Sequence, residues 1–238
     1  MQPWHLPSVL SAFDRLLAYD LVIGARTGAR LVAGADEVGL ACLAGRLAAA
    51  ACLSDWKALT SADLDRLAGL NDSKKLRPAR CRELRTVITE LAVWAEVCVA
   101  TPAEIDRDGL YDSNLRALRE TVSHLRPAPE VCFTDGAAAV PDSGYDTTAL
   151  VRGDETSAAV AAASVVAKAT RDDLMYEVIA EYPKYGFERH QGYITKEHND
   201  AIRRHGVITG LHRMSYKCGI YRELGIGPYA NPGSELAA

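Results

Sequence analysis

The pattern of apolar and polar residues along the chain predicts a succession of helices and strands. Apolar residues at helical spacing predict helices over residues 6–22, 61–70, 78–91, 102–106, 113–125, 157–181 and 195–205. Runs rich in apolar and β-branched residues predict strands over 30–35, 47–53, 94–100, 130–134 and 147–151. Turns or loops are expected at 24–28, 71–76 and 183–192, and a loose tail from residue 225. This order predicts an α/β fold with a mixed sheet flanked by helices.

Local signals add detail to five of these elements. The first two strands are expected to pair as a hairpin through the connection 39–45. Pro78 suits the first turn of its helix, and Thr195 is expected to cap the N-terminus of the helix that follows it. The small residues of 157–181 predict a helix that packs tightly against the sheet.

Composition is that of an ordinary globular protein. The 238 residues are 48% hydrophobic and 24% charged, with a mean hydropathy of -0.06. The longest weakly polar run, 43–53, is interrupted by Arg46 and is too short to span a bilayer. Residues 1–20 lack the basic start and apolar segment of a secretion signal. We therefore expect no membrane association and a cytoplasmic location.

Cysteine usage and net charge narrow the chemistry further. The six cysteines form no C-x-x-C pair and mostly lie in apolar runs, so buried free thiols are expected rather than disulfides or a zinc site. Any metal should therefore be oxygen-ligated. The net charge of -4 argues against broad, charge-driven nucleic-acid binding, although a local basic groove remains compatible with it.

Acidic residues follow three of the expected strands. Asp36 and Glu37 come at the end of the first strand, Asp135 ends the fourth, and Asp154 follows the fifth. If the four carboxylates converge, their repulsion calls for a hard divalent cation such as Mg²⁺ or Mn²⁺. Two such ions roughly 4 Å apart activate a water and stabilise the departing oxygen in phosphodiester cleavage. The alternative is a set of solvated strand ends.

Basic and aromatic residues supply candidate contacts to a polyanion. Lys74 and Lys75 lie in a polar loop, while Lys168 and Arg171 are three residues apart and share a helical face. Tyr193, next to a glycine, offers an aromatic face for a sugar or base. Ordinary surface charge and a core tyrosine are the alternatives. A zinc set of His190, His198 and His205 is disfavoured, because no cysteine or glutamate partner has zinc-site spacing.

Several long motifs follow one another along the chain. They are Gly34-Ala35-Asp36-Glu37-Val38-Gly39, Leu70-Asn71-Asp72-Ser73-Lys74-Lys75-Leu76, Asp135-Gly136, Gly153-Asp154, Ala161 to Asp172, and Tyr185-Gly186-Phe187 to Tyr193. With these motifs in this order, the chain resembles bacterial type 2 ribonuclease H (ribonuclease HII) from about residue 31 to residue 216.

The resemblance implies a ribonuclease H-like five-stranded core with a C-terminal helical extension. It also implies hydrolysis of the RNA strand of RNA–DNA hybrids with Mg²⁺ or Mn²⁺, and incision at ribonucleotides embedded in duplex DNA, as in ribonucleotide excision. The products expected are a 3'-hydroxyl and a 5'-phosphate. Asp36, Glu37, Asp135 and Asp154 would be the catalytic, metal-binding acids. The substrate-binding set would be Gly39, Leu40, Ala41, Lys74, Lys75, Ser164, Lys168, Arg171 and Tyr193.

The same resemblance suggests how the chain is divided. The expected parts are an N-terminal helical extension (1–29), the catalytic core (30–182), a C-terminal helical substrate-binding extension (183–224) and a flexible tail (225–238). A monomer is expected.

The chain departs from the family pattern close to its acids. Gly39-Leu40-Ala41 stands where Gly-Arg-Gly is usual, in a segment that reads the ribose 2'-hydroxyl and holds the scissile phosphate. Gly45-Arg46 replaces Gly-Pro, Ala137 to Ala139 follow Asp135-Gly136, and Met214 replaces a basic residue. Two alternatives therefore stay open: a weakly active or non-catalytic binding module, and a nuclease for DNA or structured RNA.

Overall fold

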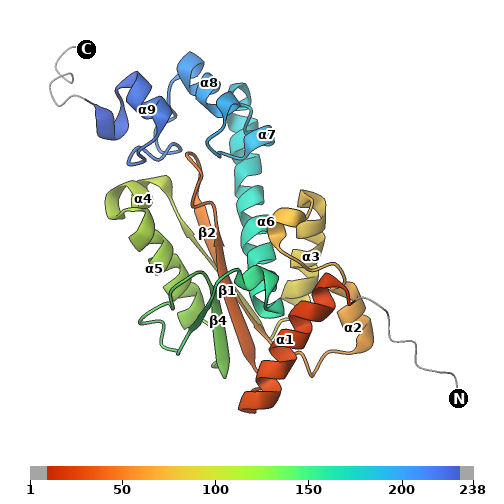
Figure 1. The fold of residues 1–238 in the computed structure, drawn as a ribbon. Coiled ribbons are helices and arrows are strands. Elements are labelled where there is room, and N and C mark those ends of the chain that lie inside the picture. Colours follow the sequence, from red (N-terminus) through yellow and green to blue (C-terminus); the bar gives the residue numbers. More distant parts are fainter. Residues whose placement is uncertain (1–9, 231–238) are drawn as a thin grey trace, which may run out of the picture.

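A five-stranded mixed sheet forms the centre of the computed structural model, which describes residues 10–230 (Figure 1). The strands are β1 (Val32–Val38), β2 (Leu47–Ser54), β3 (Trp94–Ala100), β4 (Val131–Asp135) and β5 (Thr148–Leu150). Their order is β3-β2-β1-β4-β5; β1, β2 and β3 pair antiparallel, and β1, β4 and β5 pair parallel. The α/β fold, the mixed sheet and the β1–β2 hairpin are therefore confirmed.

Helices cover both faces of this sheet. The α-helices are α1 (Ala12–Thr27), α2 (Ser61–Arg66), α3 (Pro78–Leu91), α4 (Pro102–Asp108), α5 (Leu110–Ser123), α6 (Ala158–Glu181), α7 (Phe187–His190), α8 (Lys196–His205) and α9 (Gly219–Leu224). In Figure 1, α6 lies on one face with α1 and α3, and α5 lies on the other. The segment with α7, α8 and α9 lies beyond one end of the sheet, near the β1–β2 connection. Within residues 10–230, no helix is both long and apolar enough to cross a membrane.

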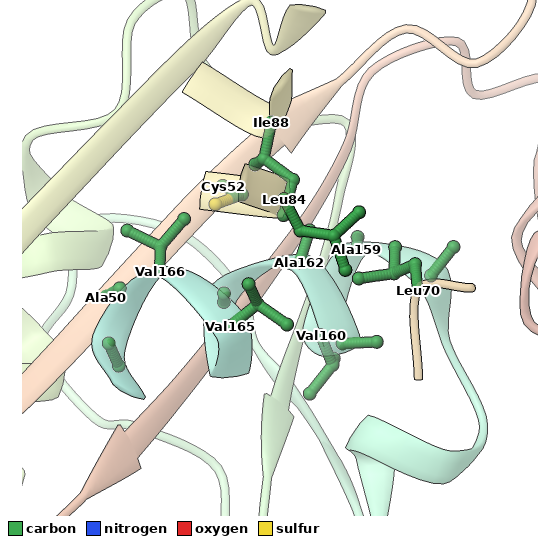
Figure 2. Packing of buried hydrophobic residues seen from close by; sticks show 14 of the residues in the cluster. Ala50, Cys52, Leu70, Leu84, Ile88, Ala159, Val160, Ala162, Val165 and Val166 are labelled. Carbon is green, nitrogen blue, oxygen red and sulfur yellow. The ribbon is translucent and has the colours of Figure 1, made fainter. Parts of the chain in front are cut away.

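Alternation along β1 and β2 divides the core into two apolar layers. Val32 of β1 and Ala50 of β2 pack with α6, whereas Ala33 of β1 and Ala49 of β2 pack on the α5 side. Figure 2 shows the first layer, where Val165 and Val166 of α6 meet the sheet. Because successive strand residues point to opposite faces, this division also decides where the acids of β1 point.

The α6 helix approaches β1 so closely that one strand position has no room for a side chain. A Cβ on Gly34 would lie 2.2 Å from the carbonyl carbon of Ala159 and from the backbone nitrogen of Val160. Alanine and valine fill the first half of α6, as the sequence predicted, and its residues up to Ala163 are almost completely buried. This contact brings the start of α6 against the strand that carries Asp36.

The N-terminal helix is fastened to the start of α6 by a buried carboxylate. Asp20 of α1 is 1% exposed, and its Oδ2 accepts hydrogen bonds from the indole Nε1–H of Trp56 at 3.0 Å and from the Ala159 N–H at 2.9 Å. Burial raises the pKa of Asp20 to about 6, while these hydrogen bonds oppose the shift. The helix therefore supports the element that follows Asp154.

Several boundaries differ from the predictions. The turn expected at 24–28 is instead the last part of α1, which ends at Gly28 with φ +79°; residues 6–9 of the expected helix lie outside the described residues. The strand expected to stop at residue 35 continues to Val38, so its acids lie within β1. Short helices that the sequence pattern did not predict occur at Ser73–Lys75, Phe187–His190, Gly219–Leu224 and Gly227–Tyr229. Such short elements cannot show the periodicity that reveals a helix.

The helix that begins after Thr195 is confirmed. Thr195 Oγ1 accepts a hydrogen bond from the His198 N–H at 3.1 Å, as an N-cap does.

Gly34→Ala is expected to destabilise the fold by about 3 kcal/mol or more, because the new methyl group would overlap the backbone of α6. Urea unfolding followed by circular dichroism measures the change. Gly219→Ala is the control, because a Cβ there would have no atom within 4 Å and its backbone is not left-handed. Equal stability of the two variants would contradict the close contact between β1 and α6.

Candidate active site

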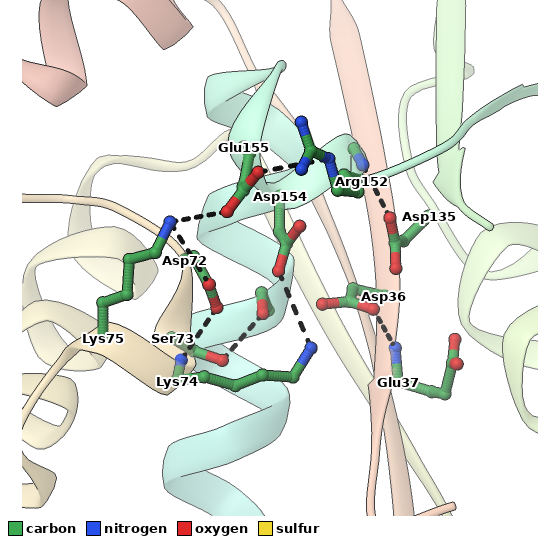
Figure 3. A network of polar contacts seen from close by, with 12 residues as sticks. Asp36, Glu37, Asp72, Ser73, Lys74, Lys75, Asp135, Arg152, Asp154 and Glu155 are labelled. Atoms are coloured by element: carbon green, nitrogen blue, oxygen red, sulfur yellow. Dashed lines mark hydrogen bonds and ion pairs between the residues drawn. The ribbon is translucent and has the colours of Figure 1, made fainter.

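The two acids of β1 point to opposite sides of the sheet. Asp36 is paired with Ala50, which packs on the α6 side, and Glu37 with Ala49, which packs on the α5 side. Asp36 is 4% exposed, and its Oδ1 accepts a hydrogen bond from the Glu37 N–H at 2.7 Å. The prediction that these acids sit at an exposed strand end was wrong, because β1 extends beyond them. Both carboxylates are nevertheless delivered to the same end of the sheet (Figure 3).

Asp135 and Asp154 reach this end from the next two strands. Parallel pairing of Ala35 with Thr134 places Asp135 beside Asp36. Asp135 Oδ1 accepts a hydrogen bond from the Gly153 N–H at 2.6 Å, which ties β4 to the turn that carries Asp154. Asp154 lies in the 3-10 turn Gly153–Glu155 just before α6 and is 5% exposed. Figure 3 shows Asp36, Asp135 and Asp154 around one region, with Glu37 to its side.

Three of these acids have raised pKa values, because they are buried close to other carboxylates. Burial, followed by repulsion from Glu37 and Asp135, raises the pKa of Asp36 well above its ordinary value. Burial and repulsion from Asp135 raise the pKa of Glu37 to about 7, and the same two causes raise the pKa of Asp154 to about 6. Lys74 opposes the last two shifts; its Nζ lies 4.0 Å from Asp154 Oδ2. One neighbouring ammonium leaves most of this negative charge uncompensated.

The donor set suits a hard divalent cation. All four side chains offer carboxylate oxygens, and burial together with repulsion from neighbouring acids raises the pKa values of Asp36, Glu37 and Asp154. Between residues 10 and 230, no three His, Cys, Asp or Glu side chains already stand in a closed metal-binding arrangement. The four acids therefore fit a divalent cation by their charge, their burial and the type of ligand that they offer.

Asp72 is a member of this neighbourhood that sequence reasoning missed. Its Oδ1 accepts a hydrogen bond from the Lys74 N–H at 2.9 Å, so it caps the turn Ser73–Lys75. Asp72 also contacts Asp154 and raises its pKa. Lys75 Nζ donates to Glu155 Oε1 at 2.5 Å and lies 3.6 Å from Asp72 Oδ2. An aspartate two residues before a lysine pair was the available signal for this cap.

The α6 residues expected to bind substrate fall into different environments. Ser164 is 3% exposed; its hydroxyl lies 2.9 Å from that of Ser73 and hydrogen-bonds the Asp36 carboxyl. Lys168 forms an ion pair with Asp172, and its side chain is 18% exposed. Ser164 thus connects the lysine loop to the carboxylates, and Lys168 is held in place by its own helix.

Arg171 is buried, and its guanidinium donates to backbone carbonyls. It is 1% exposed, its Nη2 donates to the Gln191 carbonyl at 2.8 Å, and its Nε donates to the Arg46 carbonyl at 3.2 Å. Sharing a helical face with Lys168 therefore did not give it the same environment, because the segments around residues 46 and 191 cover it. Arg171 stabilises those two segments.

The loop Gly39 to Gly45 is held by the C-terminal extension. Arg213 is fully buried, and its guanidinium donates to the carbonyls of Gly39 at 2.7 Å and Gly45 at 2.9 Å. Tyr216 Oη donates to the Leu40 carbonyl at 2.5 Å. The motif around Arg213 was visible in the sequence, but its function as a clamp on this loop follows only from the structure.

Tyr193 lies beside the same loop. Cys42 and Tyr193 form an antiparallel bridge, and the Leu43 N–H donates to the Gly192 carbonyl at 2.8 Å. Burial raises the pKa of the Tyr193 phenol, while the nearby positive charges of Arg171 and Lys74 oppose the shift. Its partly buried ring therefore lies between the loop and the lysines.

Comparison with known proteins identifies the family. A family model described as Ribonuclease HII matches residues 33–218. A ribonuclease HII from Nocardia farcinica is 43% identical over 203 residues, which cover 85% of this chain and 78% of that protein. This chain belongs to the ribonuclease HII family. It is a ribonuclease H, and enzymes of this kind act on RNA–DNA hybrids.

Solved structures agree with the fold of ribonuclease HII. The ribonuclease H2 of Pyrococcus horikoshii superposes with a TM-score of 0.67 at 23% identity, covering 82% of this chain and 96% of that one. A Bst ribonuclease HIII solved in complex with Mn²⁺ has a TM-score of 0.60 at 19% identity, covering 91% and 72%. The residues matched by the family model contain all four acids.

Asp135→Asn is expected to stabilise the metal-free protein at pH 8 by roughly 1 kcal/mol, because it removes a charge that repels Asp36, Glu37 and Asp154. The folded pKa values are raised, so this repulsion is fully present above pH about 7 and is relieved as the pH falls through 7 and 6 toward 4. The gain should therefore shrink at pH 5. Urea unfolding in EDTA measures it.

The matched control for this measurement is Asp142→Asn. Asp142 has an 85% exposed side chain, and its left-handed backbone suits asparagine. A loss of stability in Asp135→Asn at pH 8 would show that the carboxylates do not repel one another as described.

Proposed function

We propose that this ribonuclease HII cleaves the RNA strand of RNA–DNA hybrids and incises duplex DNA at embedded ribonucleotides, with Mg²⁺ or Mn²⁺, leaving a 3'-hydroxyl and a 5'-phosphate. The observation that carries the proposal is the group of four carboxylates at one end of β1, β4 and β5 (Figure 3). Burial and repulsion from neighbouring acids raise the pKa values of three of them, Asp36, Glu37 and Asp154. These acids lie within the residues matched by the family model.

Asp36, Glu37, Asp135 and Asp154 would hold the cations. Such ions, when bound, lower the pKa of a water and stabilise charge on the departing oxygen. The protein's own part is to position these acids. The Gly153 N–H fixes Asp135, and the Glu37 N–H and the Ser164 hydroxyl both bind the Asp36 carboxyl. Fixed carboxylates reduce the reorganisation needed when the substrate phosphate arrives.

Three lysines are suited to the substrate backbone. Lys74 has a 74% exposed side chain, yet its ammonium lies close to Asp154, so it can contact a phosphate held at the acids. Lys75 and Lys168 are each paired with a carboxylate, Glu155 and Asp172 respectively. We assign these two to neighbouring phosphates. Tyr193, which lies beside the Gly39–Gly45 loop, would stack near the ribose.

The segment Gly39-Leu40-Ala41 would read the ribonucleotide through its backbone. The Gly39 backbone has φ +97°, and a Cβ there would lie 2.5 Å from Arg171 Nε, so glycine is required for both conformation and space. Leu40 supplies no charge, and its side chain packs against the apolar layer on the α5 side. The loop backbone is therefore held in place, but a guanidinium contact to phosphate is missing.

Asp135→Asn is expected to reduce cleavage of a labelled RNA–DNA hybrid by about 100-fold or more, because metal-assisted charge stabilisation contributes several kcal/mol to such reactions. Steady-state rates with Mg²⁺ and with Mn²⁺ measure the effect. Asp142→Asn should cleave like the unmodified protein.

A gel shift with the same hybrid separates catalysis from binding. Retarded hybrid without cleavage in either ion would refute the proposed nuclease and favour a binding module. Faster cutting of DNA or structured RNA than of hybrids would refute the proposed substrate instead.

Leu40→Arg combined with Ala41→Gly is expected to raise cleavage beside a single ribonucleotide by about tenfold, and to raise cleavage of long hybrids less. A charge-assisted hydrogen bond to the scissile phosphate contributes about 1.5–3 kcal/mol, and junction substrates have fewer other ribose contacts. Measured kcat/KM on both substrates tests this. An equal gain on the two substrates would contradict a junction-reading function for this segment.

A further inference from the structure

The C-terminal extension contains three buried imidazoles packed around one phenylalanine. His198 is 0% exposed, His212 1% and His190 5%. The rings of His190 and His198 stack with their centroids 4.5 Å apart, and the ring of Phe187 meets His198 edge-on at 5.4 Å. Imidazole is costly to bury unless its nitrogens are hydrogen-bonded. The partners of these nitrogens therefore indicate what the cluster does.

Two of the imidazoles form a continuous chain of three hydrogen bonds. The Ile208 N–H donates to His212 Nδ1 at 2.8 Å, so this nitrogen carries no proton and His212 Nε2 does. His198 Nδ1 lies 2.9 Å from the Tyr193 carbonyl, which accepts hydrogen bonds only, so the His198 proton is on Nδ1. His212 Nε2–H can then donate to His198 Nε2, 3.2 Å away. The backbone groups at the two ends determine both tautomers.

This chain requires both rings to be neutral. A proton on His198 Nε2 would face the Nε2–H of His212, and a proton on His212 Nδ1 would face the Ile208 N–H. The pKa of His198 is lowered to about 4 and that of His212 to about 3, mainly by burial and in smaller part by repulsion from the neighbouring imidazoles. Both rings are thus neutral at about pH 7.

The chain of hydrogen bonds ends beside a backbone segment in which two successive residues have positive φ. Gln191 has φ +47° and Gly192 φ +80°, and a Cβ on Gly192 would lie 2.4 Å from the Ala44 carbonyl oxygen. Cys42 bridges to Tyr193, and Ala44 bridges to His212. The histidine chain therefore connects two contacts that the extension makes with the Gly39–Gly45 loop. A shift of the Tyr193 carbonyl would move the ring that lies beside this loop.

We propose that His198 and His212 are positioning residues that hold Tyr193 in place against the Gly39–Gly45 loop for contact with the ribose. The inference rests on the proposed function, in which Tyr193 contacts substrate. Neither histidine touches substrate; each acts through the carbonyl of Tyr193. The imidazole nitrogens that face one another are used in this chain.

Steady-state kinetics on a duplex with one ribonucleotide test the assignment. His198→Leu is expected to raise KM roughly tenfold with a smaller change in kcat, because the ring of Tyr193 loses orientation for binding. His198→Asn keeps an N–H near the position of Nδ1 and should recover most of the loss. His190→Leu is the matched control, because His190 is also buried in the cluster but bonds the Tyr185 carbonyl instead. Its KM should change less than about twofold.

A double-mutant cycle distinguishes positioning from general destabilisation. If His198 acts through Tyr193, then adding His198→Leu to Tyr193→Ala should change KM by less than about twofold. The same tenfold loss in both backgrounds would overturn the proposal, as would an equal loss in His190→Leu. Urea unfolding of each variant verifies that the compared proteins are folded.

Two further measurements test the proposal without requiring that the protein cleave any substrate. Long-range ¹H–¹⁵N spectra should show His198 protonated on Nδ1 and His212 on Nε2; the opposite tautomers or charged rings at pH 7 would overturn the proposal. Fluorescence anisotropy with the same duplex in Ca²⁺ should show weaker binding for His198→Leu and recovery for His198→Asn. If these results hold and no substrate is cut, the positioning chain stands and the proposed nuclease fails.

Discussion

The close contact between α6 and β1 is the constraint on which the site depends. Because Gly34 has no side chain and the start of α6 is almost entirely alanine and valine, the two backbones approach each other across one face of the sheet. That approach brings Ser164, within α6, to the carboxyl of Asp36, and places Asp154 directly before the helix. The buried Asp20 secures the same end of α6 from the N-terminal helix.

The acids are held together against their own repulsion. Folding places Asp36, Glu37 and Asp154 where burial and like charge raise their pKa values, and Lys74 compensates only part of this charge. Such a cost is characteristic of functional sites, where residues are arranged for a ligand rather than for stability. In the function proposed above, that ligand is a divalent cation.

Buried polar groups from α6 and from the C-terminal extension hold the other half of the site. Arg171 and Arg213 donate to carbonyls on both sides of the Gly39–Gly45 loop, and the histidine chain ends at the carbonyl of Tyr193. These groups hold backbone rather than substrate. The loop backbone is therefore held in place by contacts that do not involve the side chains of Leu40 or Ala41.

Periodicity and motif order in the sequence determined the strand set, the long helix α6 and the family, because each element and each motif depends on residues close together in the chain. They also singled out four acids that the structure brings to one end of the sheet (Figure 3). The tertiary structure alone decided that Asp36 and Glu37 are inside β1 and face opposite ways, that Asp72 joins Asp154, and that Arg171 is a buried clamp. The physical reason is that burial, pKa and hydrogen-bond partners depend on segments far apart in sequence, and α6, the loop and the extension acquire these partners only when packed together.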